Sequence, residues 1–215
     1  MANPSDPHRG QPVLSAGAEP SAAKGAMIMM HGRGADAADI LGIAQVIGRQ
    51  DLLYLAPDAA GHTWYPFSFL APVEKNEPGR SSGLNVIGDL VEWLGKAGIP
   101  PEKIALLGFS QGACLSLEFA ARRPRRYGGV FGLSGGLIGE ATKPEDYAGS
   151  LAGTPVFLGC SDIDPHIPLA RVKESTAVLQ GLGAEVTERI YPGMGHTIVE
   201  DEIMIVRGIL ENMIG

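Results

Sequence analysis

The chain has 215 residues, 45% of them hydrophobic, and a formal net charge of −7 at pH 7. This length can build one good core and is short for two, so we expect a single domain. The acidic balance argues against nucleic acid or an anionic membrane surface as a partner, because both require clustered Lys and Arg. No uninterrupted apolar stretch approaches the roughly 20 residues of a membrane-spanning helix, so stable membrane insertion is not expected.

The first residues of the chain differ in composition from the rest. Residues 1–24 are rich in Ala, Pro, Ser and Gly, which predicts a flexible tail before a single domain at 25–215; Val13 and Leu14 could add a short edge strand. The tail lacks the apolar core of a secretory signal. Cys114 and Cys160 lie in apolar runs, where a reduced cysteine acts as a small hydrophobe. We therefore expect a cytoplasmic protein.

Short apolar runs alternate with amphipathic runs along the remainder. The sequence predicts strands at 26–30, 52–56, 104–107, 129–133 and 154–160, and a half-buried edge strand at 185–191. Helices are expected at 40–47, 84–97, 111–122, from about 168 to 182 and across 203–213, with a long loop at 58–81. Asp36 or Asp39 can cap the first of these helices. Strands that alternate with helices predict an α/β fold, a mostly parallel sheet with helices on both faces.

The segment 108–112 reads Gly-Phe-Ser-Gln-Gly and joins the strand at 104–107 to the helix at 111–122. A serine in the pattern G-x-S-x-G between a strand and a helix is typical of a nucleophile elbow, which exposes the hydroxyl at the helix N-terminus. Glycine is common in this chain, at 30 of 215 residues, so the alternative is a Gly-rich turn with a solvated serine. An acid and a histidine at later strand ends would favour Ser110 as a nucleophile.

Both side chains follow in the order of an α/β-hydrolase triad. Active sites of parallel sheets gather beyond the carboxyl ends of the strands, where Asp162, Asp164 and His196 are expected. We favour Asp164 as the acid, because Ile163, Pro165 and Pro168 flank it in a stiff loop, and assign Asp162 to a turn. His196 is expected as the base, since His31 precedes the serine in a Gly-rich turn where an oxyanion hole belongs.

Two backbone N–H groups would form the oxyanion hole, that of Gln111 after the serine and that of Arg33 in the turn after the first buried strand. The substrate pocket is expected among residues that the topology places near this site. These are Trp64, Tyr65, Phe67 and His166. His62 and His166 otherwise have the alternative of exposed or locally bonded side chains. No histidine pair stands at metal-ligand spacing, so no metal is expected.

Four motifs together resemble the phospholipase/carboxylesterase family, which includes the acyl-protein thioesterases. They are HGRGAD at 31–36, GFSQG at 108–112, DPHIP at 164–168 and YPGMGH at 191–196. The resemblance covers 26–213 and implies a compact α/β-hydrolase fold without a large cap, which cleaves esters or thioesters with no cofactor. It also implies that Ser110, Asp164 and His196 form the triad and that the Arg33 and Gln111 amides form the oxyanion hole.

The chain departs from the thioesterase pattern near the expected pocket. Arg33 stands where thioesterases usually have leucine, Ala113 replaces a second glycine, and Trp64-Tyr65-Pro66 replaces a Trp-Phe-Asp-like segment. The reaction type therefore transfers better than the substrate.

These observations lead to a serine carboxylesterase that cleaves small esters with short to medium acyl chains through an acyl-enzyme. The alternative is an acyl-protein thioesterase or lysophospholipase that acts on long acyl chains. A catalytically inactive receptor is disfavoured, because it would have little need of a complete triad. The expected partner is a small-molecule ester, and a homodimer is compatible with the sequence.

Overall fold

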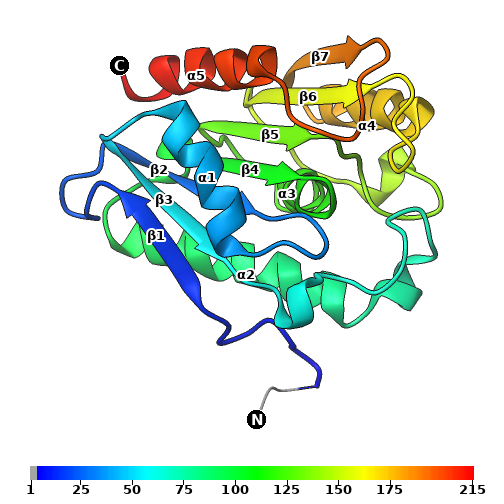
Figure 1. Cartoon of the computed structure of the whole chain (residues 1–215), viewed down its shortest axis with the longest axis horizontal. Coiled ribbons are helices and arrows are strands. Elements are labelled where there is room, and N and C mark those ends of the chain that lie inside the picture. Colours follow the sequence, from blue (N-terminus) through cyan, green and yellow to red (C-terminus); the bar gives the residue numbers. More distant parts are fainter. Residues whose placement is uncertain (1–3) are drawn as a thin grey trace.

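The apolar runs form one seven-stranded sheet in the computed structural model, which describes residues 4–215 (Figure 1). The strand order is β1-β3-β2-β4-β5-β6-β7; β1 pairs antiparallel with β3, and the other pairings are parallel. The strands are Val13–Gly17 (β1), Gly25–Met30 (β2), Leu52–Pro57 (β3), Ile104–Phe109 (β4), Gly129–Leu133 (β5), Pro155–Ser161 (β6) and Glu185–Tyr191 (β7). The predicted α/β fold is confirmed, with β7 at the sheet edge as expected.

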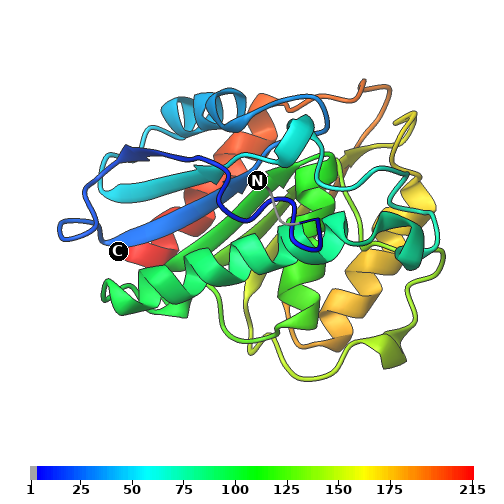
Figure 2. The same ribbon diagram turned by 90° about the horizontal axis from the view of Figure 1, so that it is seen from below.

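Helices cover both faces of the sheet. They are Ala37–Ile47 (α1), Gly79–Lys96 (α2), Gln111–Arg122 (α3), Leu169–Gly181 (α4) and Glu200–Ile214 (α5). Figure 2 shows α2, α3 and α4 on one side of the sheet and α1 and α5 on the other. Buried strand residues alternate between the two layers: Ile28 packs on the α2–α4 side and Met29 on the α1–α5 side. No helix within residues 4–215 is long and apolar enough to cross a membrane.

The two acids that competed to cap the first helix both contribute. Asp36 Oδ1 accepts from the backbone N–H of Asp39 at 3.0 Å, and Asp39 Oδ2 accepts from that of Asp36 at 3.1 Å. This reciprocal pair satisfies two N–H groups at the start of α1. It also fixes the end of the segment 31–36, which connects β2 to α1.

The expected start of α2 at residue 84 is wrong, because the helix begins at Gly79. Residues 79–83 are rich in Gly and Ser, a composition typical of a loop. Gly79 and Gly83, however, lie where the helix packs closely against its neighbours. A Cβ on Gly79 would lie 2.5 Å from the Trp64 carbonyl oxygen, and one on Gly83 would lie 2.9 Å from Leu115 Cδ1. The loop before α2 is also partly ordered, with short 3-10 turns at Ala60–His62 and Val73–Asn76.

The flexible tail expected at 1–24 needs correction for residues 4–24, whereas residues 1–3 lie outside the described part. Val13 and Leu14 do begin an edge strand, β1, which runs along the whole of β3. Upstream, His8 is buried: its Nε2 lies 2.8 Å from the Trp64 carbonyl oxygen, and its Nδ1 accepts from the N–H of Ala60 at 3.0 Å. Composition indicated disorder, but pairing with β3 and these buried bonds hold the segment on the domain.

Candidate active site

Ser110 occupies a sharp turn between β4 and α3. Its backbone has φ 54° and ψ −117°, a conformation that non-glycine residues rarely adopt. The glycines on either side make the turn possible. A Cβ on Gly108 would overlap the backbone of Gly112, and one on Gly112 would overlap that of Met30. Strand and helix thus approach each other with no side chain between them, which is the reason for glycine at both motif positions.

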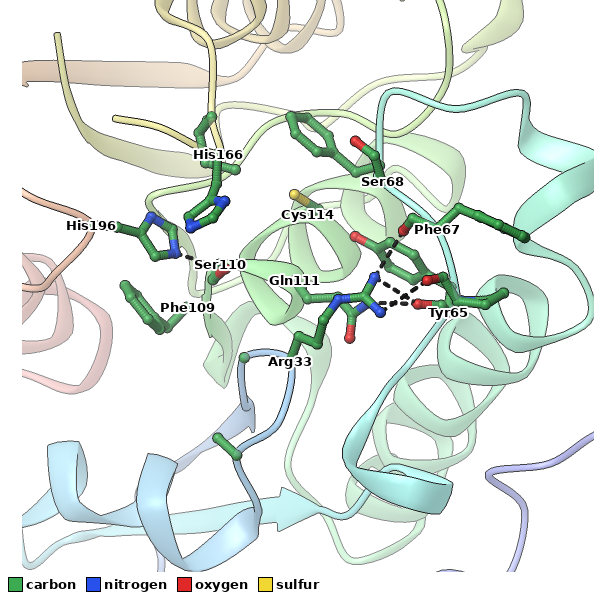
Figure 3. A pocket seen from close by; sticks show the side chains of 15 residues that line it. Arg33, Tyr65, Phe67, Ser68, Phe109, Ser110, Gln111, Cys114, His166 and His196 are labelled. Atoms are coloured by element: carbon green, nitrogen blue, oxygen red, sulfur yellow. Dashed lines mark hydrogen bonds between the residues drawn. The ribbon is translucent and has the colours of Figure 1, made fainter. Parts of the chain in front are cut away.

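The three side chains expected as a triad lie in one hydrogen-bonded row. His196 Nε2 is 2.8 Å from Ser110 Oγ, and His196 Nδ1 is 2.7 Å from Asp164 Oδ2. Figure 3 shows the His196 ring directed at Ser110 from the chain after β7. The Asp164 side chain is fully buried, whereas that of His196 is 18% exposed. This arrangement allows the hydroxyl proton to pass to the imidazole while the carboxylate fixes the ring.

Hydrogen bonds from His196 and from the backbone favour the ionised form of Asp164. Burial alone would raise the pKa of this carboxyl, but the hydrogen bonds from His196 and from the N–H groups of His166 and Ile167 outweigh it, so the pKa lies below its ordinary value. Those N–H groups lie 2.8 and 3.0 Å from Asp164 Oδ1. Asp162 instead accepts from the N–H of Gly193 at 2.8 Å, a turn contact like the one expected for it.

The two amides expected as an oxyanion hole lie at the same cavity as Ser110, since Arg33 and Gln111 both line it. Within residues 4–215, neither of these N–H groups has a hydrogen-bond acceptor. Gln111 is also the first residue of α3, so its amide carries the partial positive charge of a helix N-terminus. Such unpaired N–H groups can stabilise a developing oxyanion.

His31 has a supporting position rather than a place in the row. Its Nδ1 lies 2.7 Å from the Gly32 carbonyl oxygen, and its Nε2 accepts from the N–H of Ala59 at 3.1 Å. The side chain is 1% exposed, and burial lowers its pKa. These contacts place His31 in the turn after β2, outside the row of Ser110, His196 and Asp164. His62 is locally bonded, with Nδ1 3.1 Å from the Ala35 carbonyl oxygen.

A cavity of about 480 Å³ opens beside Ser110. Of the four residues expected to line it, Tyr65, Phe67 and His166 do so. His166 packs edge-on against His196, with 4.9 Å between ring centroids. Trp64 does not line the cavity. Its indole is fully buried and donates from Nε1 to the His31 carbonyl oxygen at 3.0 Å, so it packs in the core below the turn.

Side chains rather than regular structure fix the loop that walls this cavity. Gln111 Oε1 accepts from the N–H of Trp64 at 2.9 Å, and Gln111 Nε2 donates to the Tyr65 carbonyl at 2.8 Å. Asn76 accepts from the N–H of Phe67 and donates to the Ser68 carbonyl, both at 2.9 Å. Gln111 therefore anchors this loop directly to the first residue of α3.

Arg33 contacts the same loop, and its side chain lies beside that of Gln111 (Figure 3). Its Nη2 donates to the carbonyls of Tyr65 and Phe67 at 2.9 and 2.8 Å, and its Nη1 donates to that of Pro66 at 3.0 Å. The sequence predicted only backbone roles for Arg33 and Gln111, and it predicted no role for Phe109. Phe109 lines the cavity and packs on the His196 ring with 4.9 Å between centroids; its place inside G-x-S-x-G was the available signal.

A buried carboxyl supports the segment that follows His196. Glu202, on the first turn of α5, accepts from the Val199 N–H through Oε2 at 2.9 Å. Its Oε1 has no hydrogen-bond partner within the described residues and packs against Gly159, whose missing side chain makes room for it. Burial is the main cause that raises the pKa of Glu202 to about 7.

A comparison with protein-family models matches residues 14–214 to the phospholipase/carboxylesterase family. The chain belongs to this family. The resemblance noted in the sequence is therefore confirmed, and with it the α/β-hydrolase fold. The family member from Dyadobacter fermentans, a phospholipase/carboxylesterase of known crystal structure, is 43% identical; the match covers 94% of this chain and 97% of that one, with a TM-score of 0.91.

Two acyl-protein thioesterases are also similar to this chain. Acyl-protein thioesterase 1 of Gibberella zeae is 37% identical over 123 residues, which cover 55% of this chain and 51% of the relative. This chain thus matches about half the length of that relative. Acyl-protein thioesterase 1 of Debaryomyces hansenii is 26% identical over 225 residues, covering 94% of this chain and 97% of the relative. The chain groups with hydrolases of the esterase and thioesterase type.

Proposed function

We propose that the chain is a serine carboxylesterase that hydrolyses small esters with short to medium acyl chains. The observation that carries the proposal is the hydrogen-bonded row from Ser110 Oγ through His196 to Asp164, with distances of 2.8 and 2.7 Å. The strained Ser110 turn and the unpaired amides of Arg33 and Gln111 support the same reaction.

In the proposed mechanism, Ser110 Oγ attacks the ester carbonyl while His196 Nε2 takes the hydroxyl proton. The carbonyl oxygen becomes an oxyanion held by the Arg33 and Gln111 N–H groups. When the tetrahedral intermediate collapses, the bond to the alcohol breaks and His196 returns the proton to the departing oxygen. A water molecule, deprotonated by His196, then releases the acid from the acyl-enzyme and restores Ser110. Asp164 holds the imidazole tautomer and stabilises its protonated form.

The size of the cavity supports a short to medium acyl chain. Its volume of about 480 Å³ lies toward the lower end of the roughly 300–1,000 Å³ typical of small-molecule sites. Tyr65 and Cys114, buried residues of the loop and of α3, bound its inner side. Each buried methylene contributes about 0.8 kcal/mol, so kcat/KM should rise over the first carbons of the acyl chain and then level off.

Hydrolysis of p-nitrophenyl esters from acetate to palmitate tests this proposal, with Ser110→Ala as the control. The wild type should show the plateau, and Ser110→Ala should lose turnover by a factor on the order of 10⁶ together with labelling by a fluorophosphonate. Unchanged labelling of Ser110→Ala would rule out the nucleophile assignment.

A rise in kcat/KM that continues to palmitate would instead favour long acyl chains. That alternative, a thioesterase or lysophospholipase, has its support in the names of the Gibberella and Debaryomyces relatives. We also propose a cytoplasmic location, which the free thiols of Cys114 and Cys160 support, because reducing compartments keep thiols unpaired.

A further inference from the structure

The cavity beside Ser110 contains a guanidinium whose charge no carboxylate balances. The three acceptors of Arg33 are the backbone carbonyls of residues 65, 66 and 67. Among the ion pairs of residues 4–215, none includes Arg33. Carbonyl groups orient a guanidinium without neutralising it, so a full positive charge is held at the cavity wall.

The acids around this site accept hydrogen bonds from other groups and do not pair with Arg33. The residues that line the cavity include no Asp or Glu. Asp164 is fully buried behind His196 and accepts from three N–H groups. Asp36 and Asp58 accept from backbone N–H groups at the start of α1. The N-terminus of α3 adds further positive potential at Ser110, so two sources of positive charge lie at a cavity whose lining includes no carboxylate.

Arg33 also retains donors for a ligand. A guanidinium has five N–H groups, and three of them bond the loop carbonyls. The remaining two, on Nε and Nη1, have no acceptor within the described chain. Arg33 is an exposed residue at the cavity, so these donors are accessible to a ligand. Each can form a charge-assisted hydrogen bond with an anionic oxygen.

We propose that the preferred substrate is an ester whose acyl part ends in an anionic group, carboxylate or phosphate-like, and that Arg33 binds this group. This specifies the substrate class of the proposed esterase and rests on that function. Because the loop bonds already fix the guanidinium, little side-chain entropy is lost when the anion binds. Arg33 thereby acts as a specificity determinant as well as a support of the loop.

The test compares esters of equal shape and different charge. Ethyl half-esters of the dicarboxylic acids from succinate to suberate are assayed at pH 7.5 against the matching neutral primary amides, and ω-phosphonate esters of the same lengths form a second anionic arm. At the best length, the wild type should prefer the anion by about 5- to 10-fold in kcat/KM, a range that allows for solvent screening of an exposed arginine. The preference should shrink as salt is raised. Preference for one anion over the other identifies the ligand chemistry.

Variants then assign the preference to Arg33. In Arg33→Gln the ratio of anionic to neutral rates should fall to about 1, and Arg33→Lys should keep part of it. Because each ratio is taken within one variant, a general loss of activity from a loosened loop cancels. Arg125→Gln is the matched control: it removes the same charge from an exposed residue beyond the C-terminal end of α3, and it should keep the wild-type ratio.

The outcomes separate the two proposals. Equal rates for charged and neutral esters in the wild type would overturn the anionic substrate and leave the esterase intact. A preference that persists in Arg33→Gln would overturn the role of Arg33. If the wild type hydrolyses none of these esters and no p-nitrophenyl ester, the esterase itself is refuted. Should Arg33→Gln not fold, competitive inhibition of the wild type by free adipate and not by adipamide would still support the anion site, and equal inhibition would refute it.

Discussion

Replacing Glu202 by Gln should make the stability of the protein less dependent on pH. The carboxyl has a pKa of about 7 in the folded chain against an ordinary value of 4.5, because burial disfavours its charge and Asp201 adds repulsion. The bond from the Val199 N–H opposes this shift without cancelling it. A raised folded-state pKa means that the contribution of Glu202 to stability is fully present below pH 4.5 and is lost as the pH rises through 7.

The size of the effect follows from the difference between the two pKa values. At about 1.4 kcal/mol for each pKa unit, the wild type should lose about 3 kcal/mol between pH 4.5 and pH 8.5 through this group. Glu202→Gln cannot ionise and should not lose it. The amide has its own fixed cost, since its NH₂ group enters the space beside Gly159, but that cost does not vary with pH.

Urea unfolding of the wild type and Glu202→Gln from pH 4.5 to pH 8.5 measures this. Across this range, the free energy of unfolding of Glu202→Gln should rise by about 3 kcal/mol relative to that of the wild type. Glu200→Gln is the control, because it makes the same substitution at an exposed carboxylate on the same helical turn, and the change for Glu202→Gln should exceed that for Glu200→Gln. A change for Glu202→Gln no larger than that for Glu200→Gln would show that the buried carboxyl ionises normally, and it would refute the argument.

Two further predictions concern the triad and the elbow. Asp164→Asn should lower kcat by about 10⁴-fold in ester hydrolysis, because the imidazole loses its correct tautomer, whereas Asp162→Asn should have a far smaller effect; the reverse ranking would move the acid to Asp162. Gly112→Ala should lower the free energy of unfolding by at least about 2 kcal/mol, since its Cβ would overlap Met30, whereas Gly42→Ala in α1 meets open space and should raise it by about 0.5–1 kcal/mol. Chemical denaturation measures both, and equal effects would contradict the packing argument.

The parts of the molecule that sequence reasoning predicted well are governed by local rules. Buried parallel strands must be apolar, so β2 to β6 could be recognised from composition. Parallel strands also end at one edge of the sheet, which allowed Ser110, Asp164 and His196 to be grouped although 86 positions separate the serine from the histidine. Here the chemistry of the residues and the topology point to the same place.

What the sequence missed depends on contacts between distant segments. Trp64 and Tyr65 are adjacent aromatic residues, yet the first packs in the core, where its indole bonds the distant His31 carbonyl, and the second lines the cavity. The Arg33 side chain donates to three loop carbonyls, and no pattern in the sequence predicts these hydrogen bonds. The early start of α2 was hidden for a related reason, because glycines chosen for close packing read as loop residues when the neighbour is unknown.

The pairing of β1 with β3 determines where this chain can be shortened. A cut at residue 25, the boundary that composition indicates, would leave the outer edge of β3 with unpaired N–H and C=O groups. Such an edge is a template for association with other chains, so the shortened protein should be prone to aggregate. The same cut would remove His8 from beneath Trp64, which donates to the His31 carbonyl in the turn before Arg33. An N-terminal fusion therefore needs a linker attached ahead of residue 4, and residues 4–24 should be kept in any recombinant form.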